Sequence, residues 1–436
     1  MTMKRLMLAA AMAALITPTL LAQDTAGVRR ITLAEAVDLA LRSQPAMVTA
    51  RQNVRVADFG ERQALAAFLP SLSAGGSTSK NSPTRANSNT GQVQTFPNPY
   101  SNNFSLSASL DLFTGFRRGA LRSQAQATSN QNDAALLQQQ FATVLATKQA
   151  FFQALASAEL VGVQEAQLRR SDEQMKLTTE RLRLGATTRS DSLRARVDYG
   201  NSQVALITAQ NSLRTAEAEL ARAVQVDGLV MAVYDSSLFG RVTGLDTAAL
   251  RRDAMANAPS VRQADAAFAA AQAALHASRS SYMPTLSLSA GLGWAGSDNT
   301  PFAGTYRSTW NYRLSMSFPL FNNLSREANV ISADANVTSA QARARDARLA
   351  LDASLTQQLA ALDAAAASID VSVVSVAAAE EDLRMQRERY RLGAVTILEV
   401  LTSQASLEQA QVNLVQARYN YLVARAQIEA LVGHSL

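Results

Sequence analysis

The feature that most constrains the fold is an internal duplication of the sequence. Residues 68–75 recur as residues 282–289, and residues 181–186 recur as residues 389–394. The first pair is offset by 214 positions and the second by 208, so a loop between the two segments is 214 − 208 = 6 residues longer in the first copy. Similarity at a long period indicates a repeated structural unit. We therefore expect one protomer made of two copies of the same plan.

The order of expected elements is the same in both copies. Each has a short helix, a second helix that begins at Pro45 or Pro259, a hairpin of two strands, a very long helix, a glycine turn and a final helix. Thr32 and Glu35 have the spacing of a capping box at the first short helix. The expected domains are a signal peptide, a first repeat, a linker and a second repeat, at 1–22, 23–226, 227–245 and 246–436. The expected strands lie at about 70–80, 103–113, 284–295 and 307–320. The expected long helices cover about 117–183 and 326–391, and the final helices about 188–225 and 396–432.

The N-terminus predicts export from the cytoplasm. Lys4 and Arg5 precede an apolar run, and Ala22 is the expected cleavage residue. The chain has no cysteine, so we expect neither disulfides nor an N-terminal lipid anchor. After the signal peptide, no run of about 18 residues is unbroken and apolar, since the longest, 364–379, contains Asp370. Any crossing of a membrane is therefore expected to use strands.

The expected strands alternate between apolar and small polar residues. Leu288, Leu292 and Trp294 share one face of the third strand, while serines and glycines occupy the other. A period of two over about ten residues is typical of strands in membrane barrels. A hairpin of a soluble sandwich is the alternative interpretation of the strands taken alone.

The helices between the hairpins and the glycine turns are unusually long. Each has about 67 residues and, at 1.5 Å per residue, would extend for about 100 Å, whereas helices average about 11–12 residues. Such lengths indicate a coiled coil. The final helix supports this with two rows of core candidates at intervals of seven: Val400, Leu407, Leu414, Tyr421 and Ile428, with Ser403, Ala410, Ala417, Ala424 and Leu431 three positions later. We expect two shorter helices to stack end to end beside each long one.

Four strands per chain cannot close a barrel. Barrels in bacterial outer membranes have at least about eight strands, and an open sheet edge in lipid leaves backbone groups unpaired at several kcal/mol each. Two chains would supply eight strands around a filled interior, whereas three supply twelve around a lumen. The expected fold class is thus an α+β membrane protein: a homotrimeric 12-stranded barrel continuous with a long antiparallel α-helical barrel.

Three sets of residues carry a resemblance to a known family. The first strand of each copy begins Pro-Ser/Thr-Leu-Ser, both glycine turns read Arg-x-Arg-Leu-Gly-Ala, and residues 417–422 read Ala-Arg-Tyr-Asn-Tyr-Leu. On these residues the chain resembles the TolC-like outer-membrane channel family over essentially its whole length after the signal peptide. The resemblance implies a homotrimer in the cell outer membrane that extends into the periplasm and closes at its tip. It also implies a periplasmic adaptor and an inner-membrane pump of RND or ABC type, in a tripartite efflux (for example drug export) or type I secretion system.

An acid stands six residues after each turn glycine: Asp191 after Gly185 and Glu399 after Gly393. By similarity these positions match the family's periplasmic constriction, to which Tyr390 also belongs. A ring of carboxylates favours cations, and a neighbour such as Arg189 can bind it. The alternative is that both are ordinary acids of a first helical turn. Val395 and Thr402 occupy positions where the family often has a gate arginine and a second acid.

The two turns are the expected contacts with the adaptor. The residues are Arg181, Gly185, Ala186, Arg389, Gly393 and Ala394.

Other function classes lack their residues. His276 and His434 are the only histidines and there is no cysteine, so we expect no enzyme, metal site or cofactor. Residues 291–296 match a dinucleotide motif only by letters, because they lie inside an alternating strand. The arginines are interspersed with acids along helices, which favours solvated helix faces over a nucleic-acid surface, so we expect no nucleic acid as a partner. Outer-membrane lipid is the expected partner of the barrel. A non-transporting trimeric surface fibre and a periplasmic coiled-coil scaffold are the alternative functions.

Overall fold

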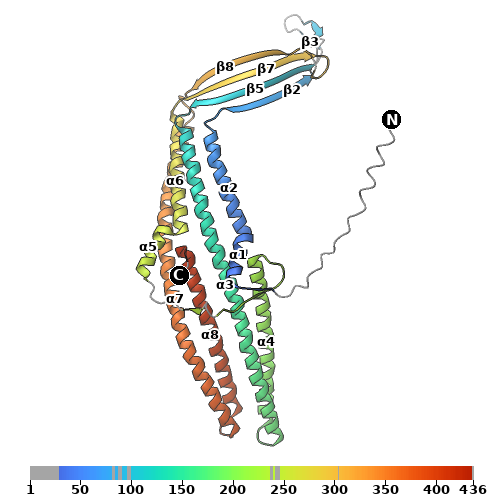
Figure 1. The fold of residues 1–436 in the computed structure, drawn as a ribbon, viewed down its shortest axis with the longest axis vertical. Helices are drawn as coiled ribbons and strands as arrows, with labels where there is room; N and C mark the ends of the chain where they lie inside the picture. The colour runs from blue at the N-terminus through green and yellow to red at the C-terminus, as the bar shows by residue number, and fades with distance from the viewer. Residues whose placement is uncertain are drawn as a thin grey trace, which may run out of the picture.

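The computed structural model shows two helical hairpins joined at one end to a sheet (Figure 1). It describes residues 29–80, 84–86, 91–95, 100–235, 239–240, 246–302 and 304–434. The signal peptide expected at 1–22 lies outside these residues, as do residues 236–238 and 241–245 of the expected linker.

The described elements repeat in order, as the duplication predicts. The helices are α1 (Leu33–Ser43), α2 (Pro45–Ala66), α3 (Arg117–Arg183), α4 (Arg189–Val224), α5 (Thr247–Asn257), α6 (Pro259–Arg279), α7 (Ser325–Arg391) and α8 (Ile397–Val432). The strands are β1 (Arg29–Ile31), β2 (Ser71–Lys80), β3 (Thr84–Ala86), β4 (Val93–Thr95), β5 (Tyr100–Phe113), β6 (Val230–Ala232), β7 (Thr285–Asp298) and β8 (Arg307–Ser317). A 3₁₀ turn, Ser280–Tyr282, precedes β7. β8 ends two residues before Pro319, which has no N–H to donate to a strand.

Short helices stack end to end beside each long one, as expected. Where α2 meets α4, Ser43 Oγ and Gln44 Nε2 donate to the last carbonyls of α4, on Val224 (3.3 Å) and Ala223 (2.8 Å). Where α6 meets α8, Gly433 lies against Pro259. Figure 1 shows α2 above α4 and α6 above α8. α3 and α7 each run past the joint unbroken for 67 residues.

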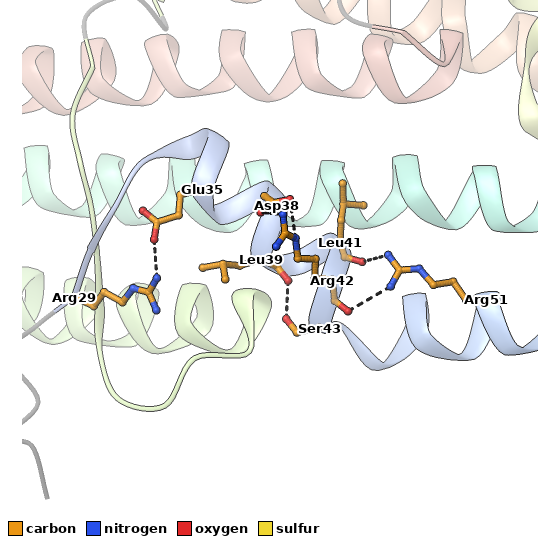
Figure 2. Close-up of polar contacts among 8 residues, drawn as sticks. All are labelled: Arg29, Glu35, Asp38, Leu39, Leu41, Arg42, Ser43 and Arg51. Atoms are coloured by element: carbon orange, nitrogen blue, oxygen red, sulfur yellow. Dashed lines mark hydrogen bonds and ion pairs between the residues drawn. The ribbon is translucent and has the colours of Figure 1, made fainter. Parts of the chain in front are cut away.

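The break between α1 and α2 is held by polar contacts (Figure 2). Arg51 Nη2 on α2 donates to the carbonyl of Leu41 at the end of α1 (2.6 Å), and Pro45 occupies the first turn of α2. The capping box expected at Thr32 and Glu35 forms in one direction only. Thr32 accepts the Glu35 N–H, but the Glu35 carboxylate pairs with Arg29 on β1 at 2.6 Å instead. A charged partner binds a carboxylate more strongly than a backbone N–H does.

The four long strands form one antiparallel sheet in the order β2-β5-β7-β8. The apolar faces coincide across the strands, with Leu106 opposite Leu292 and Leu288 opposite Leu314. The other face carries pairs of serines, such as Ser73 and Ser107, whose hydroxyl oxygens lie 2.7 Å apart. The sheet thus has one face suited to lipid and one suited to water. β5 bulges between Asp111 and Phe113.

In both copies, an equivalent arginine at the start of the long helix contacts an aromatic ring at the junction between the helices and the sheet. The guanidinium carbon of Arg118 lies 4.8 Å from the ring centroid of Phe68, and that of Arg326 lies 4.4 Å from the ring of Tyr282. The offsets are 208 for the arginines and 214 for the rings, as in the rest of the duplication. Arg118 also donates to the carbonyls of Ala67 and of β5, which fixes the angle between α2, β5 and α3.

The protomer has two open edges. β2 and β8 are the outer strands of the sheet. Among the helices, α3 lies between the pair α2 and α4 and the pair α6 and α8. The pair α6 and α8 in turn packs on α7. One edge is therefore formed by α2, α4 and β2, and the other by α7 and β8. By length and composition α7 could cross a membrane, since an 18-residue window has a mean hydropathy of 1.7, yet only 11% of that window is buried in the protomer.

The buried core lies at two levels. The larger cluster surrounds Phe151, Leu220 and Ile428 where the stacked helices meet, and it includes Ile31 and Val230 from the parallel pair β1–β6. The smaller cluster lies near the tips of the helical hairpins. β1, β6 and the β3–β4 hairpin are not predicted by the sequence pattern, because three residues are too few to show a period.

Candidate gate at the tips of the helical hairpins

Both glycine turns have the same backbone geometry. After α3, the N–H of Gly185 donates to Leu182 and that of Ala186 to Arg181; after α7, Gly393 donates to Tyr390 and Ala394 to Arg389. This pair of bonds closes a helix when the residue after the cap has a left-handed backbone. The φ angles are +73° at Gly185 and +76° at Gly393. Glycine is strongly favoured at both positions because, without a Cβ, it adopts such angles without strain.

Arg181 joins the two hairpins. Its guanidinium carbon lies 4.7 Å from the ring centroid of Tyr390, and its Nη1 donates to the backbone carbonyl of Tyr390. Tyr390 is only 4% exposed, in the cluster formed by Leu383, Ile397 and Val400. The Tyr390 hydroxyl is buried and has no hydrogen-bond partner among the described residues. The ring and carbonyl of Tyr390, and not its hydroxyl, therefore hold Arg181.

The equivalent arginine of the second copy makes no such contact. Arg389 is exposed, and its hydrogen bond, at 3.5 Å, goes to Gln386 on its own helix. The position equivalent to Tyr390 in the first copy is Leu182, which offers no polarised ring. Of these two equivalent arginines, only Arg181 contacts the other hairpin in the described part of the chain. The tips also share the buried cluster, to which α4 contributes Ala195.

Asp191 lies in a complete capping box at the start of α4. Its N–H donates to Thr188 Oγ1 (3.2 Å), while its carboxylate accepts from the Thr188 N–H (3.4 Å) and from Thr187 Oγ1 (2.9 Å). Burial by itself would raise the pKa of Asp191, but hydrogen bonds from Thr188 and Thr187 and the charge of Arg194 outweigh it and leave the pKa below its ordinary value. Asp191 is therefore a charged helix cap.

Glu399 has the same sequence position in the second copy but different surroundings. Thr396, which caps α8, makes no side-chain hydrogen bond at that cap. Glu399 is exposed and, in the described part of the chain, forms no hydrogen bond or ion pair. Its carboxylate is available to solvent and ions, unlike that of Asp191. Val395, where the family often has an arginine, packs against the buried cluster around Tyr390.

Arg189 is exposed in the first turn of α4, and it forms no ion pair with any described residue of its own chain. The structure thus brings Arg181 to Tyr390 and Asp191 to its threonines, and it leaves Arg189 and Glu399 open to solvent.

Two kinds of tip residue were not predicted from the sequence. Thr187 and Thr188 hold Asp191, and the Thr-x-x-Asp spacing of a capping box was a visible signal. Leu184 and Leu392, the residues before the turn glycines, are 76% and 84% exposed. Only the closed geometry of the turn reveals that these leucines point into solvent.

The capping box predicts how the first tip responds to Thr188→Ala. The pKa of Asp191 is lowered in the folded chain, so its ionised carboxylate stabilises the fold. This contribution to the free energy of unfolding is fully present above the pKa of an unfolded aspartate, about 3.9. It is lost as the pH falls through the lower pKa of the folded chain. At pH 7 the substitution should cost about 1 kcal/mol of local stability. Hydrogen exchange by mass spectrometry should show roughly fivefold faster exchange of the first amides of α4. Thr396→Ala, at the cap without a side-chain bond, is the control and should change exchange far less.

Comparison with known proteins places this geometry among channels. A family profile described as “Outer membrane efflux protein” matches residues 36–224 and 250–434. The protein CyaE of Bordetella pertussis is 29% identical over 410 residues, covering 91% of this chain and 81% of CyaE. TolC of Escherichia coli K12 is 24% identical over 300 residues, covering 66% of this chain and 61% of TolC.

Solved structures agree in fold. A crystal structure of CusC superposes with a TM-score of 0.79 at 20% identity and covers 92% of both chains. The Campylobacter jejuni outer membrane channel CmeC superposes with a TM-score of 0.78 at 17% identity, covering 92% of this chain and 85% of CmeC.

Proposed function

The chain belongs to the outer membrane efflux protein family, and on that premise we propose that three copies of it close into one duct with a gate at the hairpin tips. Channels of this family form trimers and act in tripartite efflux systems. The protein is an outer-membrane efflux channel of tripartite efflux or type I secretion systems that extends into the periplasm, and it is not an enzyme.

The observation that carries the trimer proposal is the match between the two open edges. On α7, the exposed residues Ile331, Leu349, Val374 and Met385 are separated by 18, 25 and 11 residues. At 3.6 residues per turn these are whole numbers of turns, so the four side chains share one face. On the opposite edge, α4 exposes Leu193, Val197, Val204 and Ile207. A neighbouring subunit would cover both rows and pair β8 with β2. The apolar stretch of α7 would then be buried by protein and not by lipid.

Charge placed on this face should prevent assembly. Val374→Lys would bury three unpaired ammonium groups in the trimer, and each buried charge without a partner costs several kcal/mol. We expect the trimer band on native gels of membrane extracts to be lost. Val373→Lys is the matched control, because Val373 lies about 100° away around α7 and is also exposed. Equal trimer yields from both variants would contradict the proposed interface.

We propose that the tip carboxylates form a constriction selective for cations. In a trimer, Asp191 and Glu399 give six carboxylates, and a carboxylate ring at a narrow point attracts cations. Asp191→Ala together with Glu399→Ala should raise single-channel conductance and abolish block by multivalent cations. Glu399→Ala alone should produce most of the change, because the Asp191 carboxylate is held by its threonines. Glu388→Ala, an exposed acid paired with Arg391, is the control, and unchanged block in the double variant would refute the constriction.

We further propose that the two turns contact a periplasmic adaptor that links the channel to a pump of RND or ABC type. The supporting features are the exposed Leu184 and Leu392 beside the exposed Arg183 and Arg391. Apolar anchors with charged neighbours are common at sites of protein association. Export assays in a deletion strain, with one adaptor and pump pair supplied at a time, would identify the pump class.

A further inference from the structure

A groove of about 670 Å³ lies directly below the sheet, between the start of α3 and the end of α6. Small residues leave its floor open; at Gly119, for example, no atom lies within 4 Å of where a side chain would begin. The upper rim is apolar, from Phe116 and Met283, and His276 and Arg279 line the middle, while Ala269 and Gln272 lie farthest from the sheet. Two basic side chains therefore lie just below the apolar rim.

The groove opens on the lipid side of the wall. Phe113 pairs with Leu286 at the foot of β5, and Leu286 shares the apolar face of β7 with Leu288 and Leu292. Phe116 packs edge-on against Phe113, with ring centroids 5.6 Å apart. Because Phe113 lies on the lipid-facing side of the sheet, Phe116 and the groove below it lie on the same side. The groove is thus at the level of the periplasmic leaflet.

Phe116 lies at the groove with a strained backbone conformation. It has a left-handed backbone (φ +66°) and is 76% exposed, and it caps α3 without a side-chain hydrogen bond. A left-handed residue with a side chain costs about 1–2 kcal/mol. The equivalent residue of the second copy, Leu324, has φ +62° and is also exposed. In both copies a residue with a strained backbone places an exposed apolar side chain where the strands end. Contacts with the acyl chains of lipids are expected to have this arrangement.

The basic middle part of the groove suits an anion. Of the residues that line it, none is acidic, and His276 and Arg279 are exposed and form no ion pair with the described residues. Arginine binds phosphate oxygens through paired N–H donors, and a histidine ring supplies a further donor. Basic pockets beside membrane-spanning segments bind the headgroups of anionic lipids.

We propose that this groove binds an anionic phospholipid of the periplasmic leaflet, one per protomer. The phosphate accepts hydrogen bonds from Arg279 and His276, and an acyl chain runs upward past Met283 and Phe116 onto the apolar face of the sheet. Such a site would hold the channel at a fixed depth without a covalent lipid. It does not depend on the gate or on the identity of the adaptor.

The test uses the purified full-length trimer in a mild detergent. Phosphatidylglycerol should raise the Tm more than phosphatidylcholine does, and native mass spectrometry should show up to three tightly bound phosphatidylglycerol molecules. His276→Gln with Arg279→Gln should at least halve the Tm rise and remove the bound lipid. Phe116→Asn should also weaken binding, while asparagine still suits the left-handed backbone.

The control removes two exposed arginines, Arg262→Gln with Arg345→Gln, and should keep the full response to phosphatidylglycerol. Arg262 lies 279 − 262 = 17 residues, or about 25 Å, from Arg279 along α6, and Arg345 lies on α7, which does not line the groove. Three outcomes would each overturn the proposal: equal effects of the two lipids on the wild type, an unchanged response in the His276 and Arg279 variant, or an equal Tm rise from inorganic phosphate alone. Trimer yield and export by the variants are measured in parallel, so a failure of assembly is distinguished from a loss of lipid.

Discussion

Replacing Arg181 with alanine should raise the conductance of the resting channel several-fold in planar lipid bilayers. Arg181 reaches from one hairpin tip of a protomer to the other, where it contacts the ring and the carbonyl of Tyr390. A cation over an aromatic ring contributes about 0.5–2 kcal/mol, and a hydrogen bond from a charged donor about 1.5–3 kcal/mol. Three such contacts in a trimer would hold the closed arrangement against opening. Without them, the hairpins should separate more often.

The matched controls separate this contact from other roles of the same residues. Arg181→Lys keeps the charge but loses the planar group, and it should give an intermediate conductance. Tyr390→Phe keeps the ring and the carbonyl and removes only a hydroxyl that is buried without a partner, so it should leave conductance unchanged. A large increase in Tyr390→Phe would show instead that the hydroxyl holds the gate shut through a neighbouring subunit.

Valine in place of Gly185 and Gly393 should abolish export while trimers remain in the membrane. A β-branched residue is strongly disfavoured at φ +73° or +76°, so both turns would have to rearrange and the exposed Leu184 and Leu392 would move. Nothing lies within 4 Å of a Cβ at Gly185, and at Gly393 the nearest atom is Arg181 Nη2 at 4.0 Å, an ordinary van der Waals contact, so the strained backbone and not a clash with the Cβ accounts for the expected loss.

Export in a deletion strain, measured together with the amount of trimer, checks this prediction. Gly162→Val is the matched control, because Gly162 lies inside α3 with open space around its Cβ position, and it should retain most export. If the turn variants lose the trimer as well, the turns serve assembly and not docking.

The architecture could be predicted because the sequence patterns that indicate it extend over many residues. Alternation over about ten residues gave the barrel strands, and 67 residues without a proline gave each of α3 and α7. The prolines at 45 and 259 marked where α2 and α6 begin. The heptad positions on α8, such as Val400, Leu407 and Ile428, are buried as expected. Each of these features repeats along the chain, so local exceptions do not hide it.

The contacts at the hairpin tips could not be predicted, because they join residues far apart in the sequence. Arg181 and Tyr390 are 209 positions apart, and no period relates them. The duplication was even misleading here, since equivalent residues behave differently: Arg181 crosses to the other hairpin while Arg389 does not, and Asp191 is held in a cap while Glu399 is open. Packing between the copies, and not the repeated sequence, decides these roles.

The pairing of β5 with β7 has a consequence for how the chain matures. Leu106 lies opposite Leu292, 186 residues later in the sequence, so the sheet cannot join until ribosomes have completed most of both copies. Pairings this distant form slowly because the intervening chain must first be brought together, whereas helices form within microseconds. We therefore expect newly exported chains to cross the periplasm as helical hairpins with unjoined strands, a state that needs protection from aggregation until lipid and sister chains are reached.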